Sequence, residues 1–210
     1  MVQCKLKGVR AISIDRYRTV NTENECKMVV ERSEFIARVK FVEREDVAKE
    51  WIKSVKAEYR DATHNCSAYV IGFDREYQYY DDNGEPHGTA GRPILGAINS
   101  LSLTNVAVVV TRNFGGKKLG VRGLIETYGK ITHDALVASN PITRLITKEI
   151  RIKTDYKNVD RIHYMIQEND AKILNESYLV DVEIKVVIAR NQAEDFAESL
   201  QSFAKEVTVV

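Results

Sequence analysis

The sequence contains few of the residues that build disulfide frameworks, zinc–thiolate sites and membrane spans. Its 210 residues include only three cysteines, and no two of them form a C-x-x-C pair. This usage is typical of a reducing compartment, so we expect a cytoplasmic protein without a disulfide framework. The most continuous apolar run, residues 106–110, is too short to cross a bilayer. Residues 1–18 hold no continuous apolar stretch, so neither a signal peptide nor a membrane partner is expected.

An excess of charge of one sign is also missing. The chain has 31 Lys and Arg residues against 30 Asp and Glu residues, which gives a formal net charge of +1. The overall charge therefore predicts no class of partner, and any electrostatic function must come from local clusters. Hydrophobic residues make up 44% of the chain and charged residues 29%, as in ordinary soluble globular proteins. A chain of this length can bury a sizeable core without metals or disulfides.

The first part of the chain predicts strands and amphipathic helices. Residues 26–42, 64–73 and 77–81 are rich in β-branched and aromatic residues and indicate strands. Residues 106–114, VAVVVTRNF, give the strongest signal of a buried strand. Three helices are expected where apolar residues recur at helical spacing. The first is capped by Asp46 and has an apolar stripe at Val47, Trp51, Val55 and Tyr59, and the second carries Ile94, Leu95, Ile98 and Leu101. The third is long, and its apolar residues are Leu124, Tyr128, Ile131, Ala135 and Ala138.

The pattern restarts near Asn140 and Pro141, where the proline argues for a boundary. The remaining residues predict the order β-α-β-β-α-β, which is that of a ferredoxin-like sandwich. The predicted elements are residues 143–154, 159–168, 171–175, 178–189, 192–204 and 207–210. We therefore predict two α+β domains, residues 1–139 and residues 140–210.

Three stretches of the first domain have an unusual composition. They are HNC-x-AY at residues 64–69, DDNGEPHGTAGRPIL at residues 81–95 and VVVTRNFGGKKLGVRGL at residues 108–124. In this order they resemble the YigZ/IMPACT family over roughly residues 30–138, and the second domain resembles the bacterial two-domain form. The resemblance implies an N-terminal domain with the ribosomal protein S5 domain 2-like fold and a ferredoxin-like C-terminal domain. This pair is similar to the two C-terminal domains of elongation factor G.

The resemblance also implies a function in translation. The eukaryotic IMPACT relatives regulate translation under amino-acid starvation by competing for the activator of the general control kinase, an interaction that also involves an extra N-terminal domain. For bacterial members, binding to RNA or to the ribosome is inferred by fold analogy. The chain departs from the family pattern at Asn113, Arg122 and Glu126, where members have tyrosine, glycine and arginine. We expect these departures to alter the affinity or specificity of a site in this loop.

The loop RNFGGKKLGVRG, residues 112–123, is the candidate site that we favour. It joins the best buried strand to the longest predicted helix and contains no acidic residue. Cations near a helix start are mildly unfavourable for the helix, whereas a cluster of them suits contacts with nucleic-acid phosphates. The alternative is that these are solvated surface charges. The candidate nucleic-acid or anion-binding residues here are Arg112, Gly115, Gly116, Lys117, Lys118 and Arg122.

The preceding loop, residues 81–93, offers two further hypotheses. Asp81, Asp82, Glu85 and His87 have cation-ligating groups, but nothing in the sequence shows that they converge. We therefore predict a turn held by side-chain to backbone hydrogen bonds and no metal site. The second half of the loop leads into a helix whose N-terminus would attract a phosphate. Thr89, Gly91 and Arg92 are the candidate contacts, and a purely structural turn fits them equally well.

No catalytic set stands out in the sequence. His64 and Cys66 point to the same face of a strand, but no positioned base or oxyanion site accompanies them, and Ser67 lacks a nucleophile elbow. We therefore predict neither a catalytic residue nor a cofactor. The function that we predict is that of a translation-linked factor that binds RNA or the ribosome. A protein partner in translation control is a further expectation. The alternatives are an enzyme that acts on a small phosphorylated substrate through residues 81–93, and a protein-interaction module.

Overall fold

The computed structural model describes residues 15–210, and their contacts divide the chain into two units. The first unit is Tyr17–Arg144, and the second contains Leu145–Val210. The division falls a few residues beyond the sequence-predicted boundary at residue 140. Residues just after that boundary form strand β7 (Pro141–Leu145), which pairs with β1 (Arg16–Val20) in a two-stranded sheet.

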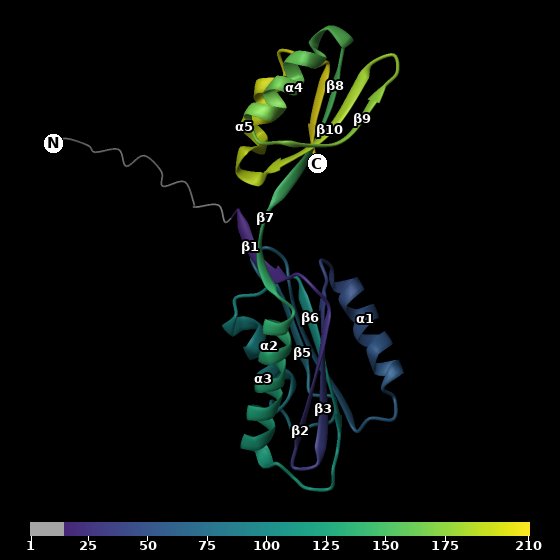
Figure 1. Ribbon diagram of the computed structural model, residues 1–210, viewed down its shortest axis with the longest axis vertical. Helices are drawn as coiled ribbons and strands as arrows, with labels where there is room; N and C mark the ends of the chain where they lie inside the picture. The colour runs from purple at the N-terminus through teal and green to yellow at the C-terminus, as the bar shows by residue number, and fades with distance from the viewer. Residues whose placement is uncertain (1–14) are drawn as a thin grey trace, which may run out of the picture. The chain divides into compact units, whose positions relative to one another are not determined.

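The first unit is built on a five-stranded antiparallel sheet with helices on both faces (Figure 1). In spatial order the strands are β2 (Asn24–Val30), β3 (Ser33–Phe41), β6 (Val106–Asn113), β4 (His64–Ile71) and β5 (Tyr77–Asp81). The helices α2 (Gly91–Ser100) and α3 (Gly120–Ala138) cover one face, and α1 (Glu45–Glu58) covers the other.

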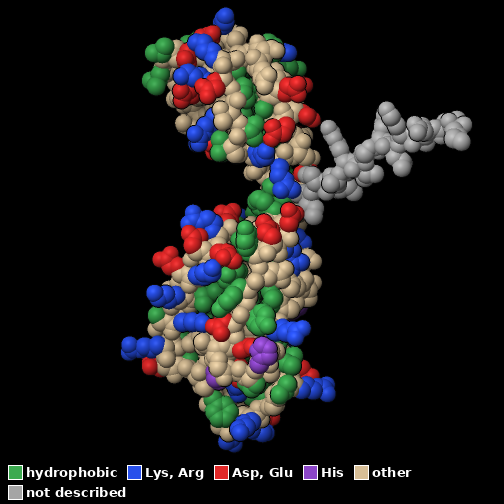
Figure 2. All heavy atoms as spheres, turned by 180° about the vertical axis from the view of Figure 1, so that it is seen from behind, with side chains coloured by type: hydrophobic (Ala, Val, Ile, Leu, Met, Phe, Trp, Pro, Cys, Tyr) green, Lys and Arg blue, Asp and Glu red, His purple; other side chains and the backbone are tan. Residues whose placement is uncertain are grey.

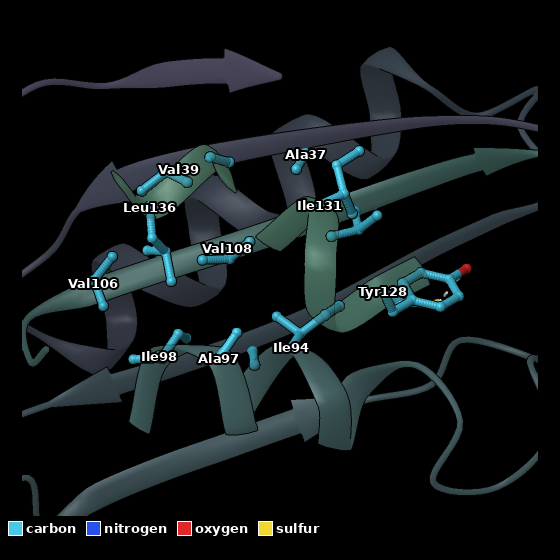
Figure 3. Close-up of a cluster of buried hydrophobic side chains, with 14 of the residues drawn as sticks. Ala37, Val39, Ile94, Ala97, Ile98, Val106, Val108, Tyr128, Ile131 and Leu136 are labelled. Carbon is cyan, nitrogen blue, oxygen red and sulfur yellow. Dashed lines mark hydrogen bonds between the residues drawn. The ribbon is translucent and has the colours of Figure 1, made fainter. Parts of the chain in front are cut away.

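Strand β6 lies at the centre of the sheet and is buried on both faces, as its apolar run predicts. Val106, Val108 and Val110 contribute to the core beneath α2 and α3, whereas Ala107 and Val109 contribute to the core beneath α1. This alternation follows from the two-residue period of a strand. Figure 3 shows the first of these cores, with Ile94, Ala97 and Ile98 of α2 and Tyr128, Ile131 and Leu136 of α3 labelled beside Val106 and Val108.

The predicted start of α1 is wrong, and its predicted apolar stripe is confirmed in part. The helix begins at Glu45, and its N-cap residue is Arg44 rather than Asp46. Val55 is buried with Ala48 and Ile52, the predicted residues Trp51 and Tyr59 pack partly buried against the same core, and Val47 is exposed. A strict four-residue spacing drifts around a 3.6-residue helix by about 40° per step, so a stripe of four such residues does not stay on one face. Ala138, predicted on the buried face of α3, is exposed at the last residue of the helix.

The second unit has the predicted ferredoxin-like order of elements. These are β8 (Thr147–Thr154), α4 (Val159–Glu168), β9 (Lys172–Tyr178), β10 (Val182–Ala189), α5 (Ala193–Leu200) and β11 (Glu206–Val209). The strands form an antiparallel sheet in the order β11-β8-β10-β9, and α4 and α5 share a core with it. Tyr178, predicted to open the third strand, instead ends β9. No helix within residues 15–210 is long and apolar enough to cross a membrane.

Candidate functional site

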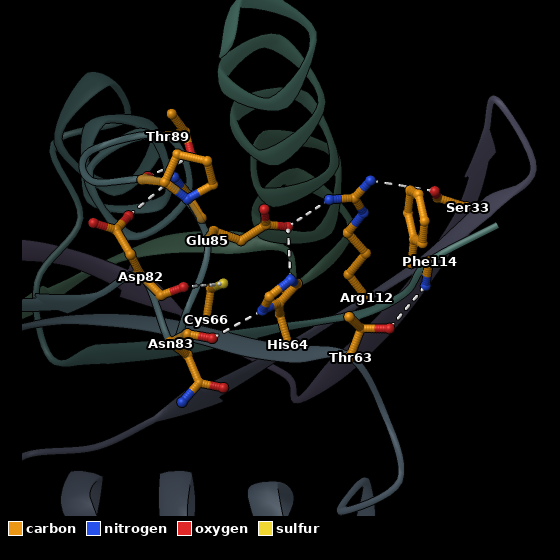
Figure 4. A network of polar contacts seen from close by, with 12 residues as sticks. Ser33, Thr63, His64, Cys66, Asp82, Asn83, Glu85, Thr89, Arg112 and Phe114 are labelled. Atoms are coloured by element: carbon orange, nitrogen blue, oxygen red, sulfur yellow. Dashed lines mark hydrogen bonds and ion pairs between the residues drawn. The ribbon is translucent and has the colours of Figure 1, made fainter. Parts of the chain in front are cut away.

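The three unusual sequence stretches meet directly at one end of the five-stranded sheet. Arg112, near the end of β6, stands opposite Phe35 of β3 and His64 of β4 in the strand register. Glu85 comes from the loop after β5 and reaches the same place, as Figure 4 shows. The sheet topology therefore brings together residues that are far apart in the sequence.

A buried ion pair between Arg112 and Glu85 holds this end of the unit together. Arg112 is 4% exposed and Glu85 is 7% exposed. The Arg112 Nη1 atom donates to Glu85 Oε1 at 2.7 Å, and the Tyr128 hydroxyl donates to the same oxygen at 2.9 Å. The guanidinium also lies 5.3 Å from the ring centroids of both Phe35 and Phe114. Arg112 therefore positions Phe114 and is not an exposed cation of the loop.

His64 contributes a ring nitrogen to the same cluster. Its Nδ1 lies 2.9 Å from the backbone oxygen of Asn83, and because a carbonyl only accepts, Nδ1 carries the proton. The other nitrogen, Nε2, is 3.9 Å from Glu85 Oε1. His64 thus links the end of β4 to the loop after β5.

Asp82 occupies the N-terminus of α2 and provides the anion there. Its carboxylate accepts hydrogen bonds from the backbone N–H groups of Gly88 at 2.7 Å, Ala90 at 3.1 Å and Gly91 at 2.8 Å. These are the groups that a phosphate bound at this helix start would use. The loop is therefore a turn held by side-chain to backbone bonds, as one of the two sequence interpretations expected.

The other residues predicted to contact an anion at α2 are Thr89, Gly91 and Arg92. The Thr89 hydroxyl donates to the backbone oxygen of Pro86 at 2.6 Å. A Cβ atom on Gly91 would lie 2.8 Å from backbone atoms of Asp81, so glycine lets α2 approach β5 closely. Arg92 is exposed at the surface.

The carboxylates of the acidic loop act separately. Asp81 forms an ion pair with Lys56 at 2.7 Å. Burial alone would raise the pKa of Asp81, but hydrogen bonds from Lys56 and the Asn83 N–H outweigh it and lower the pKa. His87 is exposed, and its Nδ1 lies 3.7 Å from Asp82. Among residues 15–210 no group of three or more His, Cys, Asp or Glu side chains is arranged to hold a metal ion.

Cys66 is a packed core residue. It is fully buried, and its thiol donates to the backbone oxygen of Asp82 at 3.0 Å. Burial is the main cause that raises the pKa of the Cys66 thiol from 9.0 to about 12. The thiol therefore stays protonated at neutral pH, which is unfavourable for a nucleophile.

The glycines of the basic loop bring it over the β2–β3 turn. A Cβ atom on Gly115 would lie 2.0 Å from the backbone oxygen of Arg32, so only glycine fits there. Gly116 has a φ of +86°, in the left-handed region that glycine favours. The backbone N–H of Phe114 donates to the Thr63 hydroxyl at 3.0 Å, which fixes the start of the loop.

Two of the loop cations have acidic partners that the loop sequence alone does not reveal. Lys117 contacts Glu31 at 2.5 Å, and Arg122 contacts Glu126 at 2.7 Å. Arg122 and Glu126 are two of the departures from the family pattern, and the structure pairs them across one helical turn. Lys118 is exposed and forms no ion pair with any residue that the structure describes. Figure 2 shows basic and acidic side chains interspersed over the first unit, with basic and hydrophobic side chains adjacent at its lower end.

A pocket of about 420 Å³ opens beside this loop. His64, Glu85 and Arg112 form its polar part, and Leu119 and Leu124 are among its apolar lining residues. Phe114, which is 45% exposed, and Lys118 also line it. Phe114 was not among the sequence-predicted site residues, because its exposure depends on contacts with Arg112 and Thr63. We call the set Phe114, Lys117, Lys118, Val121 and Arg122 the β6–α3 surface.

Comparisons with known proteins agree with this architecture. The chain matches the family model of the Impact N-terminal domain over residues 31–136 and that of a domain of unknown function (DUF1949) over residues 152–205. A crystal structure of a hypothetical protein has a TM-score of 0.69 and 26% identity, covering 94% of this chain and 97% of that chain.

Curated relatives cover most of the chain. IMPACT family member YvyE of Bacillus subtilis (strain 168) is 36% identical over 182 residues, which are 87% of this chain and 84% of the relative. IMPACT family member YigZ of Escherichia coli (strain K12) is 30% identical over 178 residues, which are 84% of this chain and 87% of the relative. With both domains matched and the family motifs brought together at one end of the sheet, the chain belongs to the IMPACT family.

Proposed function

We propose that this protein is a non-catalytic, translation-linked factor that binds RNA through the β6–α3 surface. The observation that carries the proposal is the exposed Phe114 ring beside the exposed Lys118 at the mouth of the pocket. Proteins that hold single-stranded nucleic acid combine aromatic rings that stack on bases with cations that contact phosphates. Membership of the IMPACT family supports a link to translation.

The ion pairs of Lys117 and Arg122 are compatible with this function. Both pairs are exposed, with the side chain of Lys117 62% exposed and that of Arg122 92% exposed. Exposed pairs of this kind contribute little to stability, so these cations can exchange their carboxylates for phosphates at small cost. Lys118 needs no such exchange and is the cation most directly available.

The site geometry weighs against the small phosphorylated substrate considered for residues 81–93. Asp82 takes up the N–H groups at the start of α2, and Glu85 is paired with Arg112. The protonated thiol of Cys66 supplies no nucleophile at neutral pH. A protein partner for the β6–α3 surface is an outcome that the following experiment separates from RNA.

Co-sedimentation of the purified protein with ribosomes and with ribosomal RNA, before and after nuclease treatment, tests the proposal. We expect wild-type protein to pellet in a salt-sensitive, nuclease-sensitive manner, and Lys118→Glu and Phe114→Ala to pellet less. The matched control is Lys53→Glu, which makes the same charge change at an exposed position of α1 on the opposite face of the sheet. Equal pelleting of Lys118→Glu and wild type would overturn the assigned surface, and pelleting that survives nuclease would favour a protein partner.

A further inference from the structure

The N-terminus of α3 faces the pocket, and no side chain among residues 15–210 caps it. Gly120 and Val121, the first two residues of the helix, line the pocket. The first turn contains no acidic residue, and the residue before it, Leu119, has an apolar side chain that cannot cap the helix. The first N–H groups of a helix have no intrahelical partner, and with the helix dipole they attract anions. At α2 the equivalent position is filled by Asp82.

An incompletely satisfied buried cation lines the same pocket. Arg112 is 4% exposed, and its Nε has no hydrogen-bond partner in the described part of the chain. Within residues 15–210 its charge is compensated by one carboxylate, that of Glu85. Lys118 adds a second cation to the lining. The two cations and the roughly half-charge of the helix end outweigh Glu85, so the pocket keeps a positive charge of about 1.5.

The pocket also has room and apolar surface for the body of a ligand. Its volume of about 420 Å³ lies in the range of small-molecule sites. Leu119 and Leu124 form apolar lining, and the exposed ring of Phe114 can stack on a planar group. A phosphate monoester carries about −1.5 to −2 charges at pH 7, which matches the pocket better than the single charge of a phosphodiester.

We propose that this pocket binds a nucleoside phosphate monoester, with the phosphate at the start of α3 and the base against Phe114. Two sources offer this chemistry, a free mononucleotide and the phosphorylated end of an RNA strand. For the RNA end, the inference rests on the proposed function, because it names the part of the RNA that the β6–α3 surface would hold. No bond is made or broken, so the site is one of recognition.

Calorimetric titration of the full chain tests this inference. The probes are one single-stranded RNA with either a 5′-phosphate or a 5′-hydroxyl, the four nucleoside 5′-monophosphates, and the matching nucleosides. We expect at least a tenfold preference for a phosphorylated form over its unphosphorylated counterpart. A preference within the RNA pair identifies the strand end as the ligand, and a preference confined to the mononucleotides identifies a free nucleotide.

A pair of helix variants gives the decisive comparison. Val121→Glu places a carboxylate at the exposed start of α3, where it competes with a phosphate but suits the helix dipole. Ile125→Glu makes the same charge change one turn later, at an exposed position that does not line the pocket. The phosphate preference should disappear in Val121→Glu and persist in Ile125→Glu, while both variants melt cooperatively at the wild-type temperature or above.

The outcomes separate this inference from the proposed function. RNA binding that is equally strong with and without the end phosphate, together with no binding of mononucleotides, would overturn the inference and leave the proposed function standing. Binding of mononucleotides without any RNA binding would overturn the proposed function and leave the nucleotide site standing. Equal loss of the phosphate preference in both glutamate variants would show a general charge effect and also overturn the inference.

Discussion

At the residue scale, the acidic loop shows how one sequence pattern serves several structural purposes. Asp81 pairs with Lys56, Asp82 binds the N-terminus of α2, and Glu85 pairs with Arg112. A cluster of carboxylates in the sequence is thus divided among three neighbours in the fold. The sequence predicted the turn, but the partners Lys56 and Arg112 lie too far along the chain to be assigned from local pattern.

The carboxylate of Asp82 caps the N-terminus of α2, and a substitution can test this contribution to stability. Asp82→Ala removes the acceptor of three backbone hydrogen bonds. We expect the free energy of unfolding in urea to fall by about 2 kcal/mol, since helix caps and hydrogen bonds to charged groups contribute on this scale. Asp61→Ala, at a side chain that is 95% exposed, should change it by less than about 0.5 kcal/mol. Equal stability of Asp82→Ala and wild type would contradict the role of Asp82 as a cap.

The buried thiol predicts a particular dependence of stability on pH. The pKa of Cys66 is raised by burial to about 12 in the folded protein, while the pKa of an unfolded thiol is about 8.5. Its contribution is therefore complete below the unfolded pKa and is lost as pH rises toward the folded pKa. Between pH 8 and pH 10 the stability advantage of wild type over Cys66→Ala should shrink by about 2 kcal/mol. Parallel stability curves for the two proteins would contradict this account.

At the element scale, the fold was largely predictable and the site was not. The apolar run of β6 and the order of elements in the second unit follow from local periodicity, and both are confirmed. The pairing of Lys117 with Glu31 and the exposure of Phe114 depend on the β2–β3 turn and on Arg112, which no local pattern specifies. Acidic side chains from outside the basic loop therefore pair with part of its positive charge, and the loop sequence alone does not show this.

Two glycine substitutions test how the β6–α3 loop is held. Gly115→Ala would place a Cβ atom 2.0 Å from the Arg32 backbone oxygen, so the loop must shift. We expect a loss of about 1–3 kcal/mol in the free energy of unfolding, as overpacking typically causes. Gly96→Ala lies on α2, where no atom of the described residues comes within 4 Å of the added Cβ, and should stabilise the protein by about 0.5–1 kcal/mol. Thermal unfolding would compare the two variants. If Gly115→Ala were as stable as Gly96→Ala, the close packing of Gly115 against Arg32 would be contradicted.

At the scale of the whole molecule, a formal net charge of +1 means that binding to RNA must come from a local surface. The β6–α3 surface offers Lys117, Lys118 and Arg122, so the number of phosphate contacts is small. Each single-stranded contact contributes about −0.7 to the slope of log affinity against log salt. Three contacts therefore predict a slope of about −2, of which one cation accounts for about a third.

The decisive test of RNA binding through the β6–α3 surface is the affinity for a single-stranded RNA over a salt series. Fluorescence anisotropy would compare wild type, Lys118→Gln and the control Lys53→Gln. We expect Lys118→Gln to weaken binding at low salt and to make the slope less negative by about 0.7, whereas Lys53→Gln leaves both unchanged. Identical slopes for wild type and Lys118→Gln, or no RNA binding at low salt, would contradict RNA binding through this surface.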